Sequence, residues 1–261
     1  MIPRRIYDHV KTHNWFAVGV DLAIVVLGVF LGTQVSNWNE ERETRARGEV
    51  FSARLKDDLL FEAWGFQYIF EYNDDVLKSA ETAMDALEGR AALDDEALLV
   101  AAYRATQYRE PRRRRSTYDE LISTGGIGLI RDRAFRSLAI RVYTTPIFDN
   151  IRREGVDSRY RELFRMAVPT AIQRALSRSC GDRDVVIGDY ASIVDQLDYP
   201  CKTGLPPAAL RDAAAALRAN PLTVPLLRLR IANLDSRRGD MLSLVNGDIR
   251  EALKKLRESG S

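Results

Sequence analysis

Histidine is nearly absent from this sequence. The chain of 261 residues contains two histidines, His9 and His13, and none after residue 13. The rest of the chain therefore lacks the imidazole needed for a Ser-His-Asp triad, a Cys-His pair, a histidine-ligated zinc ion or a histidine proton relay. His9 and His13 lie one helical turn apart without further ligands, and we interpret their segment as an amphipathic stretch at a membrane interface. We expect no cofactor and no bound metal.

A large excess of one charge sign is lacking as well. Lysine and arginine total 39 and aspartate and glutamate total 37, for a formal net charge of +2. Binding along a nucleic acid needs clustered cations that replace counterions, so we predict no nucleic-acid partner. The densest cationic run is four arginines at 112–115. We interpret this run as a solvated loop, with binding to lipid phosphates as the alternative.

Only one long apolar run exists, and it lies near the N-terminus. Residues 15–35 carry a single charged side chain, Asp21. As a helix this segment is about 31 Å long, enough to cross the hydrocarbon core of a bilayer. Trp15 and Trp38 flank the segment and are expected to anchor it in the two headgroup layers. We predict a single transmembrane anchor over residues 15–38 in contact with the lipid bilayer, in preference to a cleaved signal peptide or a buried core helix.

Cysteine is also scarce, and the two cysteines, Cys180 and Cys201, lie close in sequence. An isolated pair that closes a short loop is typical of an oxidising compartment, so we predict a disulfide, with two unrelated buried thiols as the alternative. Basic residues flank the apolar segment on both sides, but a short basic tail normally stays in the cytoplasm. We therefore expect residues 1–14 to form a cytoplasmic tail and residues 39–261 to form a soluble helical domain outside the cytoplasm.

One face of the predicted membrane helix carries unusual residues. Asp21, Gly28 and Gly32 recur at helical spacing and therefore share a face. Glycines let two helix backbones approach closely, and a carboxyl group in hydrocarbon needs a partner or must be neutral. We predict that this face packs against protein, either a second copy of the chain or a partner membrane helix. The alternative is that the glycines carry no special role, since glycine is common in membrane helices.

Two sequence motifs allow a family to be named. The first consists of the spaced glycines and acidic residue of the apolar segment, followed by Gln34-x-x-Asn37-Trp38-Asn39-Glu40. The second is the stretch STYDELISTGGIGLIRDRAFRSLAIRVY, residues 116–143. Together they resemble a family of bacterial single-pass membrane proteins of uncharacterised function. The resemblance implies an anchored helical architecture in a bacterial membrane, and it implies no activity. With the orientation argued above, we expect the anchor in the bacterial inner membrane and the large domain in the periplasm.

Beyond the anchor the sequence predicts helices throughout. Apolar residues recur every three or four positions over residues 51–87, and because no proline lies between residues 4 and 110 this helix can continue unbroken out of the membrane segment. Gly89 is expected to end it. A second long helix is predicted over residues 224–256, where the apolar spacing is that of a coiled coil. The predicted fold class is all-α, with one N-terminal transmembrane helix followed by an antiparallel helical bundle whose first and last helices are long.

Shorter helices are expected between these two. The run Leu93-Asp94-Asp95-Glu96 is expected to begin one helix, with its carboxylates at the positive end of the helix dipole, and Thr117 with Glu120 fits a capping box that begins another. Two more helical stretches are expected between residues 146 and 179. Residues 180–205 have the composition of an irregular segment, with room for a short strand at 184–187.

The chemistry of the carboxylates separates the functional hypotheses. The adjacent pairs Asp57–Asp58 and Asp74–Asp75 point to different faces of a helix, and we interpret them as solvated surface. The first hypothesis is therefore a membrane-anchored helical interaction or scaffold protein without catalytic activity. A ligand-sensing helical domain that acts through a partner is the second. A carboxylate-dependent enzyme is the third, and it would require acidic residues from distant segments to meet in a cleft.

Overall fold

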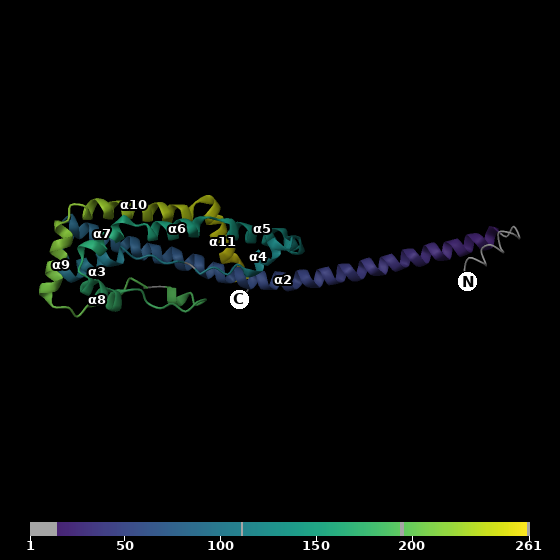
Figure 1. The fold of residues 1–261 in the computed structure, drawn as a ribbon, viewed down its shortest axis with the longest axis horizontal. Coiled ribbons are helices and arrows are strands. Elements are labelled where there is room, and N and C mark those ends of the chain that lie inside the picture. The colour runs from purple at the N-terminus through teal and green to yellow at the C-terminus, as the bar shows by residue number, and fades with distance from the viewer. Residues whose placement is uncertain (1–14, 111, 194–195, 260–261) are drawn as a thin grey trace.

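A computed structural model describes residues 15–110, 112–193 and 196–259 of the chain. The protein is all-α, as predicted, and no strand occurs within these ranges. Figure 1 shows a long helix that leaves a bundle of shorter ones. The described helices are α2 (Trp15–Leu87), α3 (Asp95–Arg104), α4 (Ser116–Ser123), α5 (Arg133–Thr144), α6 (Ile147–Val156), α7 (Arg159–Ala167), α8 (Thr170–Cys180), α9 (Pro207–Ala219), α10 (Thr223–Leu242) and α11 (Leu244–Glu258), with 3-10 turns η1 (Gly126–Leu129) and η2 (Ala191–Ile193).

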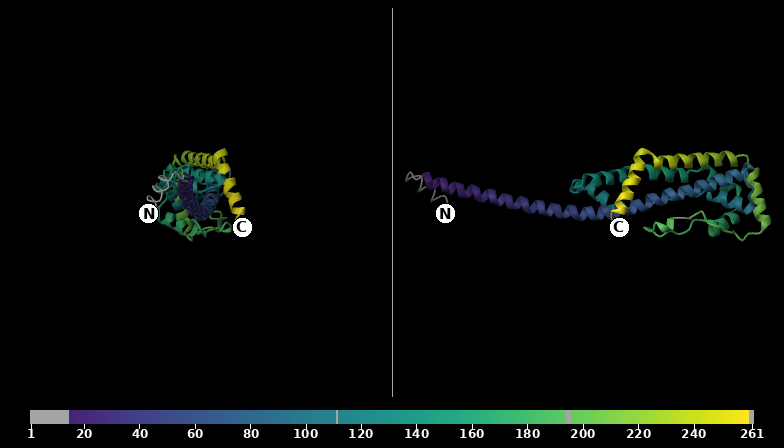
Figure 2. Two further views of the ribbon diagram at one scale, coloured as in Figure 1. Left: turned by 90° about the vertical axis from the view of Figure 1, so that its right-hand side faces the viewer. Right: turned by 180° about the vertical axis from the view of Figure 1, so that it is seen from behind.

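Helix α2 combines the predicted anchor and the first helix of the bundle in one element. It is 73 residues long and therefore about 110 Å from end to end. The predicted continuity is confirmed, so the boundary expected at residues 38 and 39 lies inside a helix. The N-terminal part of α2 projects away from the bundle, and its C-terminal part runs through it (Figures 1 and 2).

Gly48 marks the point where α2 enters the bundle. It is the first buried residue of the helix, and a methyl group at this position would lie 2.7 Å from the carbonyl oxygen of Leu129 in η1. A side chain would therefore push the backbone of η1 away. The absence of a side chain at Gly48 allows α2 and η1 to pack backbone against backbone.

The buried residues form two apolar clusters along α2. The first cluster surrounds Leu55, Leu59 and Ile69 and joins α2 to α4, α5, α6 and α11. The second surrounds Tyr72, Val76 and Ala80 and joins α2 to α3, α7, α8, α9 and α10. Figure 2 shows the other helices arranged around α2 in the end-on view. Because the apolar positions of α2 belong to both clusters, this helix is the centre of the domain.

The predicted single helix over residues 224–256 is wrong, because two helices occupy this region. α10 runs beside α2, whereas α11 turns across the bundle (Figure 1). At Ser243, between them, the backbone is extended. The Ser243 hydroxyl and the Asn246 side-chain amide both donate to the carbonyl of Asp240, at 2.7 and 2.8 Å. These two side-chain donors take the place of the backbone N–H that would bond the Asp240 carbonyl if the helix continued.

Helix starts were predicted with mixed success. Asp94 caps α3 by accepting from the Ala97 N–H, and Gly89 follows the end of α2 with a positive φ, as expected. The capping box at Thr117 is wrong, because α4 has no side-chain cap of its own. Instead the carboxylate of Asp58, on α2, accepts from the Thr117 N–H at 3.4 Å.

The region between residues 146 and 179 also differs from its prediction. It forms three helices, α6, α7 and α8, rather than two. Ser158 begins α7 by accepting from the Arg161 N–H, and Pro169 separates α7 from α8. The segment from 181 to 206 is irregular as predicted, and residues 184–187 form no strand.

Candidate functional site

The first candidate site is the projecting part of α2. Within the described residues this is the one helix with an apolar segment long enough to cross a membrane, and none of that segment is buried in the protein. Trp15 and Trp38 are both exposed at its two ends. Asp21, Gly28 and Gly32 lie on one face of the helix, and a methyl group at either glycine would meet open space. The surface is therefore free to accept lipid or a second helix.

The two cysteines meet at the far end of the domain. Cys180 ends α8 and Cys201 lies in the irregular segment, and their sulfur atoms are bonded at 2.13 Å. Cys180 is fully buried. The bond ties the segment 181–200 into a closed loop against α3.

Arg104 of α3 holds this loop from the inside. Its Nε donates to the carbonyl of Cys180 at 3.2 Å, and its Nη2 donates to the carbonyl of Tyr199 at 2.9 Å. The Tyr199 ring stacks on the Arg104 guanidinium at 4.6 Å and on that of Arg183 at 3.8 Å. Burial lowers the pKa of Arg104, and contacts with Tyr199 oppose that shift. Arg104 was not singled out from the sequence, because its partners lie 76 and 95 positions away.

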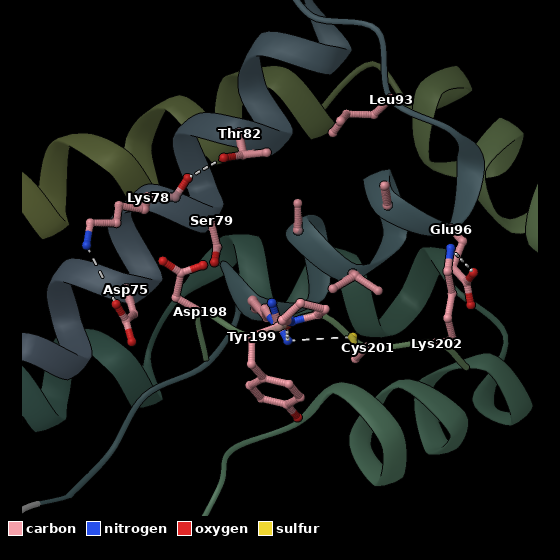
Figure 3. A pocket seen from close by; sticks show the side chains of 15 residues that line it. Asp75, Lys78, Ser79, Thr82, Leu93, Glu96, Asp198, Tyr199, Cys201 and Lys202 are labelled. Carbon is pink, nitrogen blue, oxygen red and sulfur yellow. Dashed lines mark hydrogen bonds and ion pairs between the residues drawn. The ribbon is translucent and has the colours of Figure 1, made fainter. Parts of the chain in front are cut away.

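A cavity of about 280 Å³ opens beside the disulfide, and we call it the disulfide cavity (Figure 3). Helix α2 supplies polar side chains to its wall, α3 supplies a largely apolar wall, and the loop supplies residues around the disulfide. Its lining consists of Asp75, Lys78, Ser79, Thr82, Leu93, Glu96, Ala97, Val100, Ala101, Arg104, Asp198, Tyr199, Pro200, Cys201 and Lys202.

Carboxylates from two distant segments line the disulfide cavity. Asp75 comes from α2 and Asp198 from the loop, and Lys78 lies 3.8 Å from Asp75 but closer, at 3.1 Å, to Asp74. Burial raises the pKa of Asp75, and the negative charge of Asp198 adds to this rise. Figure 3 shows Asp198 and Ser79 on the same side of the cavity. The carboxylates of Asp75 and Asp198 and the Ser79 hydroxyl can accept hydrogen bonds from an amine.

The opposite side of the disulfide cavity is a closed polar cluster. Glu96 accepts from the backbone N–H and the hydroxyl of Thr203 at 2.7 and 2.6 Å, and it lies 3.0 Å from the Lys202 ammonium. The hydrogen bond from Thr203 lowers the pKa of Glu96. Apolar surface in the same lining is supplied by Leu93, Ala97, Val100 and Ala101. The cavity therefore suits a small molecule with polar ends and an apolar body.

The arginine run at 112–115 is a loop, as predicted, but it is only partly solvated: Arg112 and Arg114 are exposed, whereas the Arg113 side chain is largely enclosed. Arg113 pairs with the buried carboxylate of Glu62 at 2.5 Å and donates to the carbonyl of Val142. The backbone N–H of Arg114 donates to the same carboxylate at 2.7 Å, and Arg115 donates to the carbonyl of Tyr143. The run therefore fastens the segment before α4 to α2 and α5.

Two carboxylates that were expected at the surface are also enclosed. Asp58 is 6% exposed and bonds Thr117, and the side chain of Asp75 is 12% exposed. Glu62, the carboxylate that pairs with Arg113, is buried as well. Burial raises the pKa of Glu62, and the positive charge of Arg113 partly opposes this rise. These acids serve the packing of α2 against its neighbours, which the local sequence does not reveal.

Comparison with known proteins gives no assignment for this site: no family model, curated protein or solved structure matches the chain. The family resemblance of the two motifs therefore stays a prediction. Among the described residues, no group of three or more histidine, cysteine, aspartate or glutamate side chains is arranged to hold a metal ion. His9 and His13 lie outside these residues.

Proposed function

We propose that the protein is a single-pass, membrane-anchored helical interaction protein that acts as a scaffold without catalysis. The observation that carries the proposal is the continuity of α2, whose exposed apolar segment leads directly into the core of the domain. An apolar helix surface of this length is unstable in water and stable in lipid. The same helix then organises both clusters of the domain, so the anchor and the scaffold are one element.

The domain is proposed to face the periplasm of a bacterial cell, with residues 1–14 in the cytoplasm. The Cys180–Cys201 bond supports this orientation, since structural disulfides persist in oxidising compartments. The residues of the proposed cytoplasmic tail lie outside the described part of the chain.

Thiol labelling of intact cells tests this orientation. A membrane-impermeant maleimide is applied before and after a reductant that does not enter the cytoplasm. We expect labelling of Cys201, which is partly exposed, only after reduction. Labelling that needs opened cells but no reductant would place the domain in the cytoplasm with free thiols, and it would overturn the proposal.

The proposed contact surface in the membrane is the face that contains Asp21, Gly28 and Gly32. Leucine at both Gly28 and Gly32 would keep the helices apart and reduce association of the chain, measured by cross-linking in native membranes. Gly19 provides a matched control, because it lies about 160° around the helix from Asp21. Gly19→Leu is expected to leave cross-linking unchanged. An equal loss of cross-linking in the two variants would rule out the proposed contact face.

Ligand sensing is the second candidate function, and the disulfide cavity favours it. Asp75, Lys78 and Ser79 line this cavity and belong to the helix that forms the proposed anchor. A ligand there would contact α2 directly, and a partner helix in the membrane could register the change. Titration of the full chain with 1,5-diaminopentane, followed by tyrosine fluorescence, tests this role. Asp198→Asn should abolish a saturable signal that Asp212→Asn, on the exposed face of α9, leaves intact.

A further inference from the structure

A second cavity, of about 400 Å³, lies between α2 and α11 and is separate from the disulfide cavity. We call it the basic cavity. Its α2 side consists of Ala63, Phe66 and Gln67, and its other side is formed by α11 together with Tyr190. The α11 residues that line it are Arg250, Glu251, Leu253, Lys254 and Arg257.

Three cations of α11 face the basic cavity together. Arg250, Lys254 and Arg257 are spaced by four and three residues, so they occupy one face of the helix. Glu251 is the one carboxylate in the lining. The lining therefore carries three positive charges against one negative charge, which leaves a local excess of cations in a concave surface.

Aromatic rings hold the two arginines in place. The guanidinium of Arg250 stacks on the Phe70 ring at 4.2 Å, and that of Arg257 stacks on the Tyr190 ring at 4.4 Å and shares a hydrogen bond with the Tyr190 side chain. Stacking on Phe70 occupies the face of the Arg250 guanidinium and leaves N–H donors at its edge for an oxyanion. Arg250 and Lys254 form no ion pair with any residue that the structure describes, so both charges remain available.

We propose that the basic cavity binds a phosphate group of a small, multiply charged anion. Planar arginine donors and a lysine point charge on one concave surface are the arrangement that recognises phosphate oxygens. The phosphate belongs to a soluble molecule rather than to a lipid of the anchoring bilayer. Along α2, Ala63 lies 25 residues beyond Trp38, which is about 38 Å of helix. This last step rests on the proposed anchor, whereas the phosphate site itself does not.

Calorimetric titration of the full chain in nonionic detergent micelles tests the site. Pyrophosphate is the soluble probe, phosphatidylglycerol mixed into the micelles is the lipid probe, and potassium chloride at matched ionic strength is the blank. We expect saturable binding of pyrophosphate and none of the lipid or the chloride. Arg250→Gln should weaken pyrophosphate binding about tenfold, because a charge-assisted hydrogen bond is lost.

Adjacent lysines on α11 supply the matched control. Lys254→Gln removes a cation of the lining, whereas Lys255→Gln removes the same charge at an exposed position outside it. We expect weaker pyrophosphate binding in the first variant only, with unchanged thermal unfolding in both. Equal weakening in the two variants, or no saturable binding to the unchanged chain, would refute the site. Saturable binding of phosphatidylglycerol would overturn the assignment to a soluble molecule. The thiol labelling of intact cells described above tests the orientation of the anchored domain separately, so failure of the phosphate site and failure of the proposed function can be told apart.

Discussion

Arg230 gives the sharpest test of how the domain is held together. This α10 side chain is 1% exposed, and its Nη1 lies 2.6 Å from both carboxylate oxygens of Glu154 on α6. Its Nε and Nη2 donate to the carbonyls of Ala105 and Gln107, just after α3, at 3.1 and 2.8 Å. Arg230→Met keeps an apolar stem but leaves a largely buried carboxylate and two carbonyls without this donor. We expect a loss of about 3–5 kcal/mol in the free energy of unfolding.

Thermal unfolding followed by circular dichroism measures this loss. For a domain of this size the expected fall in unfolding temperature is about 10 °C. Arg228, two residues earlier, pairs with Glu88 at 2.8 Å but is 67% exposed, so Arg228→Met should cost less than about 1 kcal/mol. Combining Arg230→Met with Glu154→Leu should recover part of the stability by removing the unpaired charge. If the Arg230 and Arg228 variants unfold at the same temperature, the buried pair does not hold α10 to α6.

Three further outcomes are expected from the same unfolding assay. Replacing Cys180 and Cys201 by serine opens a loop with a sequence separation of 21 and should cost about 3 kcal/mol, whereas an unchanged unfolding temperature would mean that the bond does not constrain the chain. Gly48→Ala should destabilise the domain by about 1–3 kcal/mol, because the added methyl group meets the Leu129 carbonyl. Gly239→Ala, whose methyl group meets open space in α10, should stabilise the domain by about 0.5–1 kcal/mol. A stability change of the same sign in both variants would contradict the close approach of α2 and η1. Burial raises the pKa of the Asp75 carboxyl above its ordinary 3.8, so the folded chain binds this proton more tightly than the unfolded chain and loses stability as the pH rises through the folded pKa. Asp75→Asn should therefore be more stable than the unchanged chain at neutral pH but not in strong acid. A stability difference that does not change with pH would exclude this effect.

The parts of the fold that sequence reasoning reached depend on local patterns. The apolar segment, the unbroken α2 and the cap at Asp94 follow from composition, the absence of proline and residues a few positions apart. The break at Ser243 was missed, because the apolar spacing continues across it while two side chains bond one carbonyl. Periodicity reports which face of a helix is apolar, and it does not report a competing hydrogen bond.

The candidate sites were harder to predict, because their residues meet only in the folded chain. Arg113 and Glu62 are 51 positions apart, and each looks like ordinary surface charge among its neighbours. The pairing of the two cysteines was open to sequence reasoning, but the cavity beside them depends on the path of the irregular loop. Neither Asp198 nor Arg250 carries a local signal of the cavity it lines.

The continuity of α2 also fixes the angle about the helix axis at which the domain faces relative to the apolar segment. Residues 39–47 contain no glycine or proline, and the helix is unbroken across them, so the apolar segment and the domain share one helix axis and one angular register. One residue inserted there would turn the domain by about 100° and raise it by about 1.5 Å, whereas seven would restore its azimuth to within about 20°. If chains associate through the face of Asp21, Gly28 and Gly32, as proposed above, the stretch between Trp38 and Gly48 sets which sides of neighbouring domains meet.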